Sequence, residues 1–131
     1  MLTIDAKDAV PIWKQIEQGM RHLVASRALR PGGVVPSVRD LARELRVNPM
    51  TVSKAYQRLA DQGVLEVRRG EGTFVAASPP SVPPAERSRT LQLAATRLVS
   101  VAVTLGASRE EALACVRSAW GGTATRRGGS R

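Results

Sequence analysis

Residues 36–62 contain two short amphipathic segments separated by only a few residues, and this spacing constrains the fold more than any other feature. Two sets of apolar residues follow the i, i+3, i+4, i+7 spacing of one helix face: Val38, Leu41, Ala42 and Leu45, then Val52, Ala55, Tyr56 and Leu59. Two amphipathic helices joined this tightly must cross at a steep angle, as in a helix-turn-helix. The chain therefore predicts such a motif near its centre.

Start and stop signals support both helices. Ser37 is a predicted N-cap of the first helix, and Asp40 favours the positive end of that helix. Asn48 as cap and Pro49 as first residue mark the start of the second helix. Gly63 can take the left-handed conformation that closes a helix, so the second helix is expected to end there.

A β-hairpin is predicted directly after the two helices. Residues 64–69 alternate like a strand, residues 70–72 form a turn, and residues 73–75 return. Two strands alone are marginally stable, so we expect them to pair with residues 34–35 and to pack on the helices. A hairpin in this position is the wing of a winged helix-turn-helix.

An earlier helix is expected to begin at Pro11 and to end before the break at residues 30–33. Its apolar stripe consists of Ile12, Ile16, Met20, Leu23 and Val24. The fold class that follows is mainly α with a small β-hairpin. Residues 1–76 are the predicted winged helix-turn-helix domain.

The amino-acid composition divides the rest of the chain into a linker, a two-helix unit and a tail. Residues 77–85 hold four prolines and are predicted to be an extended linker. Residues 86–120 are predicted to form a two-helix unit, broken at Gly106 and restarted by a capping box of Ser108 and Glu111. Residues 121–131 contain Gly, Ala, Thr, Ser, and Arg without an apolar pattern, and we expect a disordered basic tail.

The helix predicted over residues 86–105 is apolar on more than one side, so it must be mostly buried. One partner helix cannot cover it, whereas a second copy of the chain can. The sequence therefore predicts a homodimer; packing of this helix on the chain's own N-terminal domain is the alternative. The predicted dimerisation residues are Leu91, Ala94, Leu98, Val101, Ala102, Leu105, Leu113, Val116 and Trp120.

The formal net charge of +9 indicates a polyanionic partner, either nucleic acid or an anionic membrane surface. No segment is long and apolar enough to predict a membrane span, and the N-terminus does not resemble a signal peptide, so we expect a cytoplasmic protein. Cys115 and His22 are the single cysteine and histidine, which excludes an internal disulfide and predicts no metal site. No cofactor is predicted.

Several stretches together resemble the GntR family of bacterial transcriptional regulators. They are PIWKQI at residues 11–16, PSVRDLA at 36–42, VNPMTV at 47–52, AY at 55–56 and GEGTFV at 70–75. The resemblance covers about residues 8–76, and the short two-helix remainder resembles the YtrA-like subfamily, whose C-terminal part is a small dimerisation unit. Such a protein binds an inverted-repeat operator as a homodimer, commonly as a repressor.

The resemblance implies DNA contacts by Arg39, by the start of the second helix of the motif and by the wing tip. The predicted DNA-binding residues are Ser37, Arg39, Asn48, Pro49, Met50, Thr51, Ser53, Lys54, Arg58, Arg69, Gly70 and Gly72. At two positions the residue differs from the one that many relatives carry. Ser53 stands where many have arginine, and Glu71 stands at the wing tip, where many have a basic residue and where a carboxylate would be repelled by phosphate.

The sequence is also compatible with interpretations other than an operator-binding regulator. The arginines at 39, 43 and 46 are also compatible with a solvated face paired with Asp40 and Glu44. A winged-helix module for protein assembly or RNA binding is the alternative function. Some family members carry an aminotransferase-like domain, but no lysine follows Lys54, so no Schiff-base lysine is present and no enzyme is predicted. The existence of a small-molecule effector, the operator sequence and the choice between repressor and activator stay open.

Overall fold

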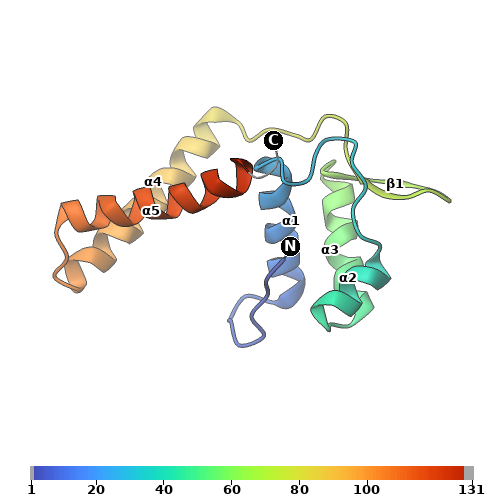
Figure 1. Cartoon of the computed structure of the whole chain (residues 1–131), viewed down its shortest axis with the longest axis horizontal. Coiled ribbons are helices and arrows are strands. Elements are labelled where there is room, and N and C mark those ends of the chain that lie inside the picture. Colours follow the sequence, from blue (N-terminus) through green and yellow to red (C-terminus); the bar gives the residue numbers. More distant parts are fainter. Residues whose placement is uncertain (1, 129–131) are drawn as a thin grey trace. The chain divides into compact units, whose positions relative to one another are not determined.

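The computed structural model describes residues 2–128 and divides the chain into two compact units, Met1–Pro80 and Ser81–Arg131. The first unit contains α1 (Ile12–Ala25), α2 (Val38–Leu45), α3 (Pro49–Asp61), β1 (Leu65–Arg68) and β2 (Gly72–Val75). The second contains α4 (Pro84–Thr104) and α5 (Arg109–Gly128). Figure 1 shows this order along the chain. The expected architecture of a helix-turn-helix, a hairpin and a helical pair is confirmed.

Local capping explains where the helices of the first unit begin and end. The Ser37 hydroxyl accepts a hydrogen bond from the Asp40 N–H at 3.0 Å, and the Asn48 side chain accepts one from the Met50 N–H at 2.8 Å. Both predicted N-caps are therefore confirmed. Gly63, just beyond α3, has φ of 78°, as expected for a residue that closes a helix. Pro11 differs slightly from its prediction, since it precedes α1 as the cap.

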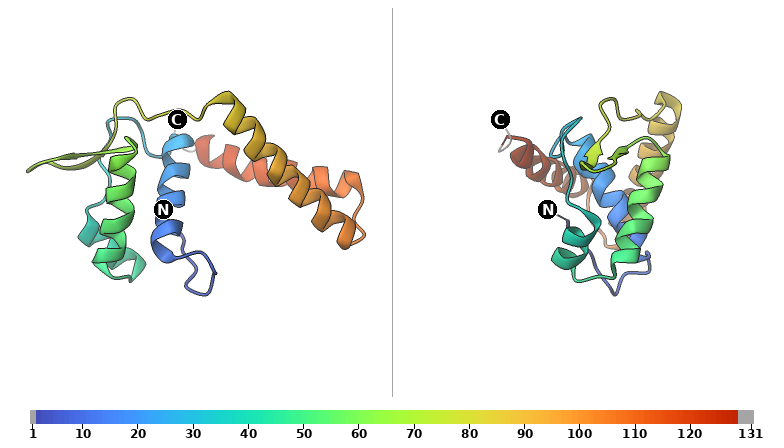
Figure 2. Two further views of the ribbon diagram at one scale, coloured as in Figure 1. Left: turned by 180° about the vertical axis from the view of Figure 1, so that it is seen from behind. Right: turned by 90° about the vertical axis from the view of Figure 1, so that its right-hand side faces the viewer.

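The two strands form an antiparallel hairpin in which Leu65 pairs with Val75 and Arg68 with Gly72. The expected pairing of residues 34–35 with the hairpin is present, because Val34 forms an isolated bridge with Phe74. The Val35 N–H also donates to the Thr73 carbonyl at 2.9 Å. The segment before α2 therefore holds the base of the wing against the helices (Figure 2).

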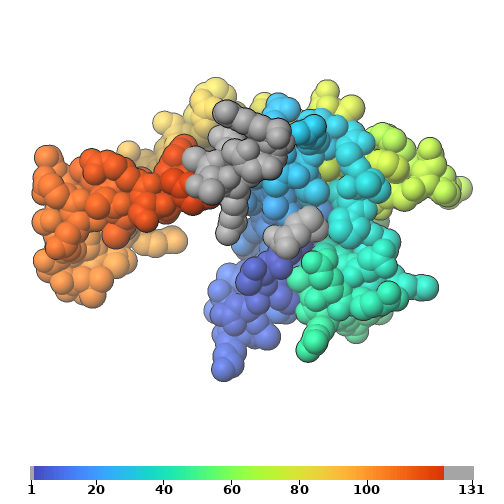
Figure 3. All heavy atoms as spheres, viewed as in Figure 1, coloured from blue at the N-terminus to red at the C-terminus, as the bar shows by residue number. Residues whose placement is uncertain are grey.

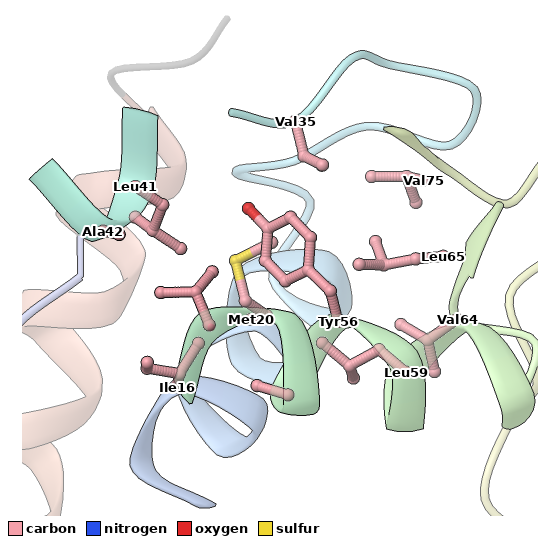
Figure 4. Close-up of a cluster of buried hydrophobic side chains, with 12 residues drawn as sticks. Ile16, Met20, Val35, Leu41, Ala42, Tyr56, Leu59, Val64, Leu65 and Val75 are labelled. Atoms are coloured by element: carbon pink, nitrogen blue, oxygen red, sulfur yellow. The ribbon is translucent and has the colours of Figure 1, made fainter. Parts of the chain in front are cut away.

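Twelve hydrophobic residues form the core, and all of them belong to the first unit. Figure 4 shows side chains from three helices, the hairpin and Val35 meeting around Tyr56. The Tyr56 hydroxyl donates to the Pro36 carbonyl at 2.7 Å, which ties α3 to the residue before the Ser37 cap. Burial, followed by the charge of Glu44, raises the pKa of the Tyr56 phenol, so it remains a neutral donor. In the space-filling view the unit forms one continuous body (Figure 3).

In the second unit α4 packs beside α5, and the Ser108 hydroxyl accepts a hydrogen bond from the Glu111 N–H at 3.1 Å. Two boundaries differ from the sequence prediction. Helix α4 starts two residues earlier, because Pro84 suits the first turn of a helix. Helix α5 continues to Gly128, so residues 121–128 are helical where a disordered tail was predicted. Residues 129–131 lie outside the described part.

No helix within the described residues is both long and apolar enough to cross a membrane.

Candidate nucleic-acid interface

The start of α3 is an exposed helix end supported by its cap. Pro49 occupies the first turn, so the missing N–H of proline leaves no hydrogen bond unmade there. Asn48, Met50 and Ser53 are exposed, whereas Thr51 is half-buried. The Met50 side chain is 78% exposed, which is unusual for a residue of this type and leaves it available to a partner. The N–H groups of Met50 and Thr51 both donate to Asn48, at 2.8 and 2.9 Å, so the attraction of this helix end for phosphate comes from the positive end of its dipole.

Three arginines lie along one face of α2 and the turn after it. Arg39, Arg43 and Arg46 follow a spacing of four and then three residues, and all three are exposed. Within residues 2–128 the ion pairs involve other cations, namely Arg58, Arg68 and Arg109. The alternative in which the α2 arginines pair with Asp40 and Glu44 therefore finds no support. These three arginines therefore form no ion pair within the described residues.

A second basic group lies where α3 packs against α1. The Lys54 Nζ is 4.4 Å from the centroid of the Trp13 ring, and the Arg58 guanidinium is 4.8 Å from it. The Arg58 Nε also donates to a Glu17 carboxylate oxygen at 3.0 Å. Of the two predicted DNA-binding residues, Lys54 lies beside an aromatic ring and forms no ion pair within the described residues, whereas Arg58 pairs with Glu17.

Glu17 is the one charged residue in the buried set, with 6% of its surface exposed. Its second carboxylate oxygen accepts a hydrogen bond from the Gln62 side chain at 3.0 Å. Burial by itself would raise the pKa of Glu17, but the hydrogen bonds from Arg58 and Gln62 and the charges of Arg58 and Arg21 hold it below its ordinary value. Glu17 is therefore ionised at neutral pH and fixes the side of α3 that faces α1.

Sequence reasoning missed both Glu17 and Trp13. The available signal was their spacing, since the two lie four residues apart on one side of α1, beside the apolar stripe. Their partners on α3 are about forty residues further along the chain, at a separation of 41 for the Glu17–Arg58 pair. No local pattern reports such a distant pairing.

The wing presents a short exposed tip. Arg69, Gly70 and Glu71 connect the strands and are all exposed. Gly70 and Gly72 have φ of 77° and 122°, which are conformations that favour glycine, so the predicted turn is fixed by these two residues. Arg68 lies over the Phe74 ring at 4.1 Å and pairs with Glu66 at 3.4 Å, so its charge belongs to the hairpin. At the tip itself one basic and one acidic side chain are exposed.

The predicted dimerisation residues lie together on the second unit and are largely uncovered. Helix α4 has no buried residue. Leu91 is 65% exposed, Leu105 77% and Trp120 71%, whereas Leu98, Val101, Leu113 and Val116 range from 36% to 50%. Ala94 is exposed, and only Ala102 is half-buried. A single chain therefore leaves most of this apolar surface in contact with water.

Known proteins share the N-terminal pattern. The sequence model of the bacterial regulatory proteins of the gntR family matches residues 13–75. The transcriptional repressor YtrA of Bacillus subtilis (strain 168) is 43% identical over 76 residues, which cover 58% of this chain and 58% of YtrA. The chain thus matches little more than half of the length of that relative.

Solved structures extend the comparison. YtrA from Sulfolobus acidocaldarius, a GntR-family transcription factor, is 34% identical, with a TM-score of 0.58, covering 73% of this chain and 97% of that one. The DNA-binding domain of AraR in complex with an operator is 25% identical, with a TM-score of 0.51, covering 58% of this chain and 92% of that domain.

The capped and exposed start of α3, the exposed arginines of α2 and the hairpin wing define a winged helix-turn-helix protein of the DNA-binding class. The chain belongs to the GntR family of bacterial regulatory proteins. Within that family it is similar to the YtrA regulators.

Proposed function

We propose that this protein is a cytoplasmic transcriptional repressor that binds an inverted-repeat operator as a homodimer. The observation that carries the proposal is the exposed start of α3 beside three arginines that have no acidic partner among the described residues. The similarity to the B. subtilis repressor YtrA favours repression over activation. The solved complex of AraR with its operator supports DNA as the partner of this fold.

In this proposal the start of α3 enters the major groove. Asn48, Met50, Thr51 and Ser53 face base edges and the adjoining phosphates, while Ser37 and Pro49 position the backbone N–H groups of the two helix ends. Arg39 donates bidentately to a guanine or to a phosphate. In this arrangement a few side chains read the base sequence of the operator. Most of the binding affinity comes from the contacts between positive side chains and phosphates.

The remaining predicted residues have lesser roles. Lys54, held beside Trp13, lies on the side of α3 toward α1 and contacts backbone phosphate. The wing brings Arg69 close to the backbone through the turn at Gly70 and Gly72. Arg58 pairs with Glu17 through its Nε, and its half-exposed side chain remains a predicted DNA contact.

In this proposal the second unit forms the dimer interface. Leu91, Leu105 and Trp120 are each more than half exposed in a single chain, and large exposed apolar residues gathered on one pair of helices are typical of an interface. Covering it with the same surface of a second copy gives two-fold symmetry. Two-fold symmetry in turn places two α3 helices on symmetric half-sites, which explains the choice of an inverted repeat.

The test is fluorescence anisotropy with the protein's own promoter fragment, with scrambled DNA and a matched RNA duplex as controls. We expect tight binding to the promoter fragment and weak binding to both controls. Equal binding to all three nucleic acids, or none, would overturn the proposal and favour the assembly or RNA-binding alternative. Sedimentation of the intact chain and of a chain ending at Val75 tests the dimer, and only the intact chain should be dimeric.

A further inference from the structure

The turn between α2 and α3 contains a backbone conformation that its residue does not favour. Arg46 has φ of 57° and ψ of 48°, the left-handed conformation in which a side chain is strained and glycine is preferred. The Val47 N–H donates to the Ala42 carbonyl at 3.0 Å, which is the closing hydrogen bond of the helix C-terminal motif that normally uses glycine at this position. Arg46 thus occupies a site where a residue without a side chain would fit better.

The Arg46 side chain is exposed, and within residues 2–128 the ion pairs and ring contacts involve other cations. A strained residue whose charge is not used in such an interaction points to an external role. The residue lies three positions after Arg43 and two positions before Asn48, the cap of α3.

We propose that Arg46 is a phosphate-binding residue, held at the turn in the left-handed conformation so that its guanidinium contacts the DNA backbone beside the α3 start. This rests on the proposed function, and it adds a contact outside the predicted set. A guanidinium matches the geometry of a phosphate and remains charged at all physiological pH values. Because a phosphate contact carries no sequence information, Arg46 should contribute equally to operator and to non-specific DNA.

Arg27 provides a matched control within the same unit. It also has a positive φ, 63°, it is exposed, and it also lies just beyond the end of a helix, α1. The end of α1 and the α2–α3 turn lie at opposite ends of the first unit (Figures 1 and 2). Replacing either arginine with glycine removes one positive charge at a residue of positive φ, so the two variants are matched in charge and differ in position.

The experiment compares Arg46→Gly, Arg46→Gln and Arg27→Gly with the wild-type chain by anisotropy titration of operator and scrambled DNA across a salt series. Each phosphate contact contributes about 0.9 to the slope of log affinity against log salt. A dimer loses two contacts when each subunit loses one, so the slope of the Arg46 variants should be shallower by about 1.8. At 0.15 M salt this corresponds to binding that is weaker by roughly 30-fold. The ratio of operator to scrambled affinity should not change, and Arg27→Gly should behave as wild type.

Each outcome decides the inference. An unchanged slope in folded Arg46→Gly would overturn it, and so would an equal loss in Arg27→Gly, which would indicate only overall charge. Arg46→Gln removes the charge but keeps a side chain at the turn. If the glycine variant does not fold, the salt slope of Arg46→Gln therefore tests the phosphate contact. Failure of the wild-type chain to prefer its operator would instead refute the proposed function, independently of Arg46.

Discussion

Replacing Glu17 with glutamine should destabilise the first unit by removing the charge that joins α1 to α3. The Glu17 carboxylate accepts hydrogen bonds from Arg58 and Gln62, both at 3.0 Å, and its side chain is 7% exposed. Glutamine has nearly the same shape, so packing around the site is conserved, but it offers one acceptor oxygen where the carboxylate offers two. The expected effect is therefore the loss of the negative charge and of one of the two hydrogen bonds.

Breaking a fully buried pair costs about 3–5 kcal/mol, because the remaining charge is left without a partner. That cost does not apply in full here, since the Arg58 side chain is 47% exposed and water can solvate it after the change. A hydrogen bond to a charged group is worth about 1.5–3 kcal/mol. We therefore expect Glu17→Gln to lower the free energy of unfolding by about 1.5 kcal/mol at pH 7. A double-mutant cycle with Arg58→Met should give a coupling energy of about 1 kcal/mol.

The chain offers a local probe for this measurement. Trp13 lies against Lys54 and Arg58 in the same cluster, and Trp120 is the other tryptophan. In a Trp120→Phe background, fluorescence during urea unfolding reports on Trp13 alone. With a slope of about 1 kcal/mol/M for a small domain, the midpoint should fall by roughly 1.5 M urea.

The pH dependence supplies an independent check. Because the pKa of Glu17 is lowered by folding from its ordinary value of 4.5, its ionised form stabilises the protein above that value. This stabilisation is lost as the pH falls through the range below 4.5, so wild type and Glu17→Gln should converge in acid. A difference that stays constant from pH 7 to pH 3, or equal midpoints at pH 7, would refute the assigned role of the carboxylate.

Three further changes test other parts of the structure. Arg39→Ala should leave the fold intact and weaken operator binding by about 1–3 kcal/mol per half-site in anisotropy titrations, and unchanged affinity would contradict the assignment. Glu71→Arg at the exposed wing tip should steepen the salt dependence of binding by up to about 1.8 per dimer, whereas parallel salt curves would show that the wing does not approach DNA. Tyr56→Phe should lower thermal stability by about 1 kcal/mol, because the Pro36 carbonyl loses its 2.7 Å hydrogen bond; calorimetry measures this directly.

The features that sequence predicted well are those specified within one or two helical turns. The caps at Ser37 and Asn48 are residue types whose short side chains reach the N–H groups two or three positions onward, and both form as expected. The apolar spacing likewise identified the buried faces of α2 and α3, including Leu41 and Tyr56. Such local signals were sufficient to place the helix-turn-helix.

The features that were missed depend on partners far apart in the sequence, or on residues in an environment or backbone conformation that their type disfavours. A glutamate in a helix normally faces water, so only the packing of α3 on α1 reveals why Glu17 is buried. Arg46 gives no sequence signal for the end of α2, because glycine is the expected residue there. The roles of the predicted DNA contacts remain predictions, since side-chain position alone does not define the bound nucleic acid.

The uncovered apolar surface of α4 has a consequence for how the protein responds to its own abundance. A single chain can complete the core around Tyr56, because that core uses only residues of the first unit, but it cannot cover Leu91 or Leu105. Under the proposed dimer, pairing follows mass action and depends on chain concentration. At low copy number the occupancy of an operator then rises with the square of that concentration. A modest change in synthesis or dilution by cell growth would produce a larger change in the expression of the controlled genes.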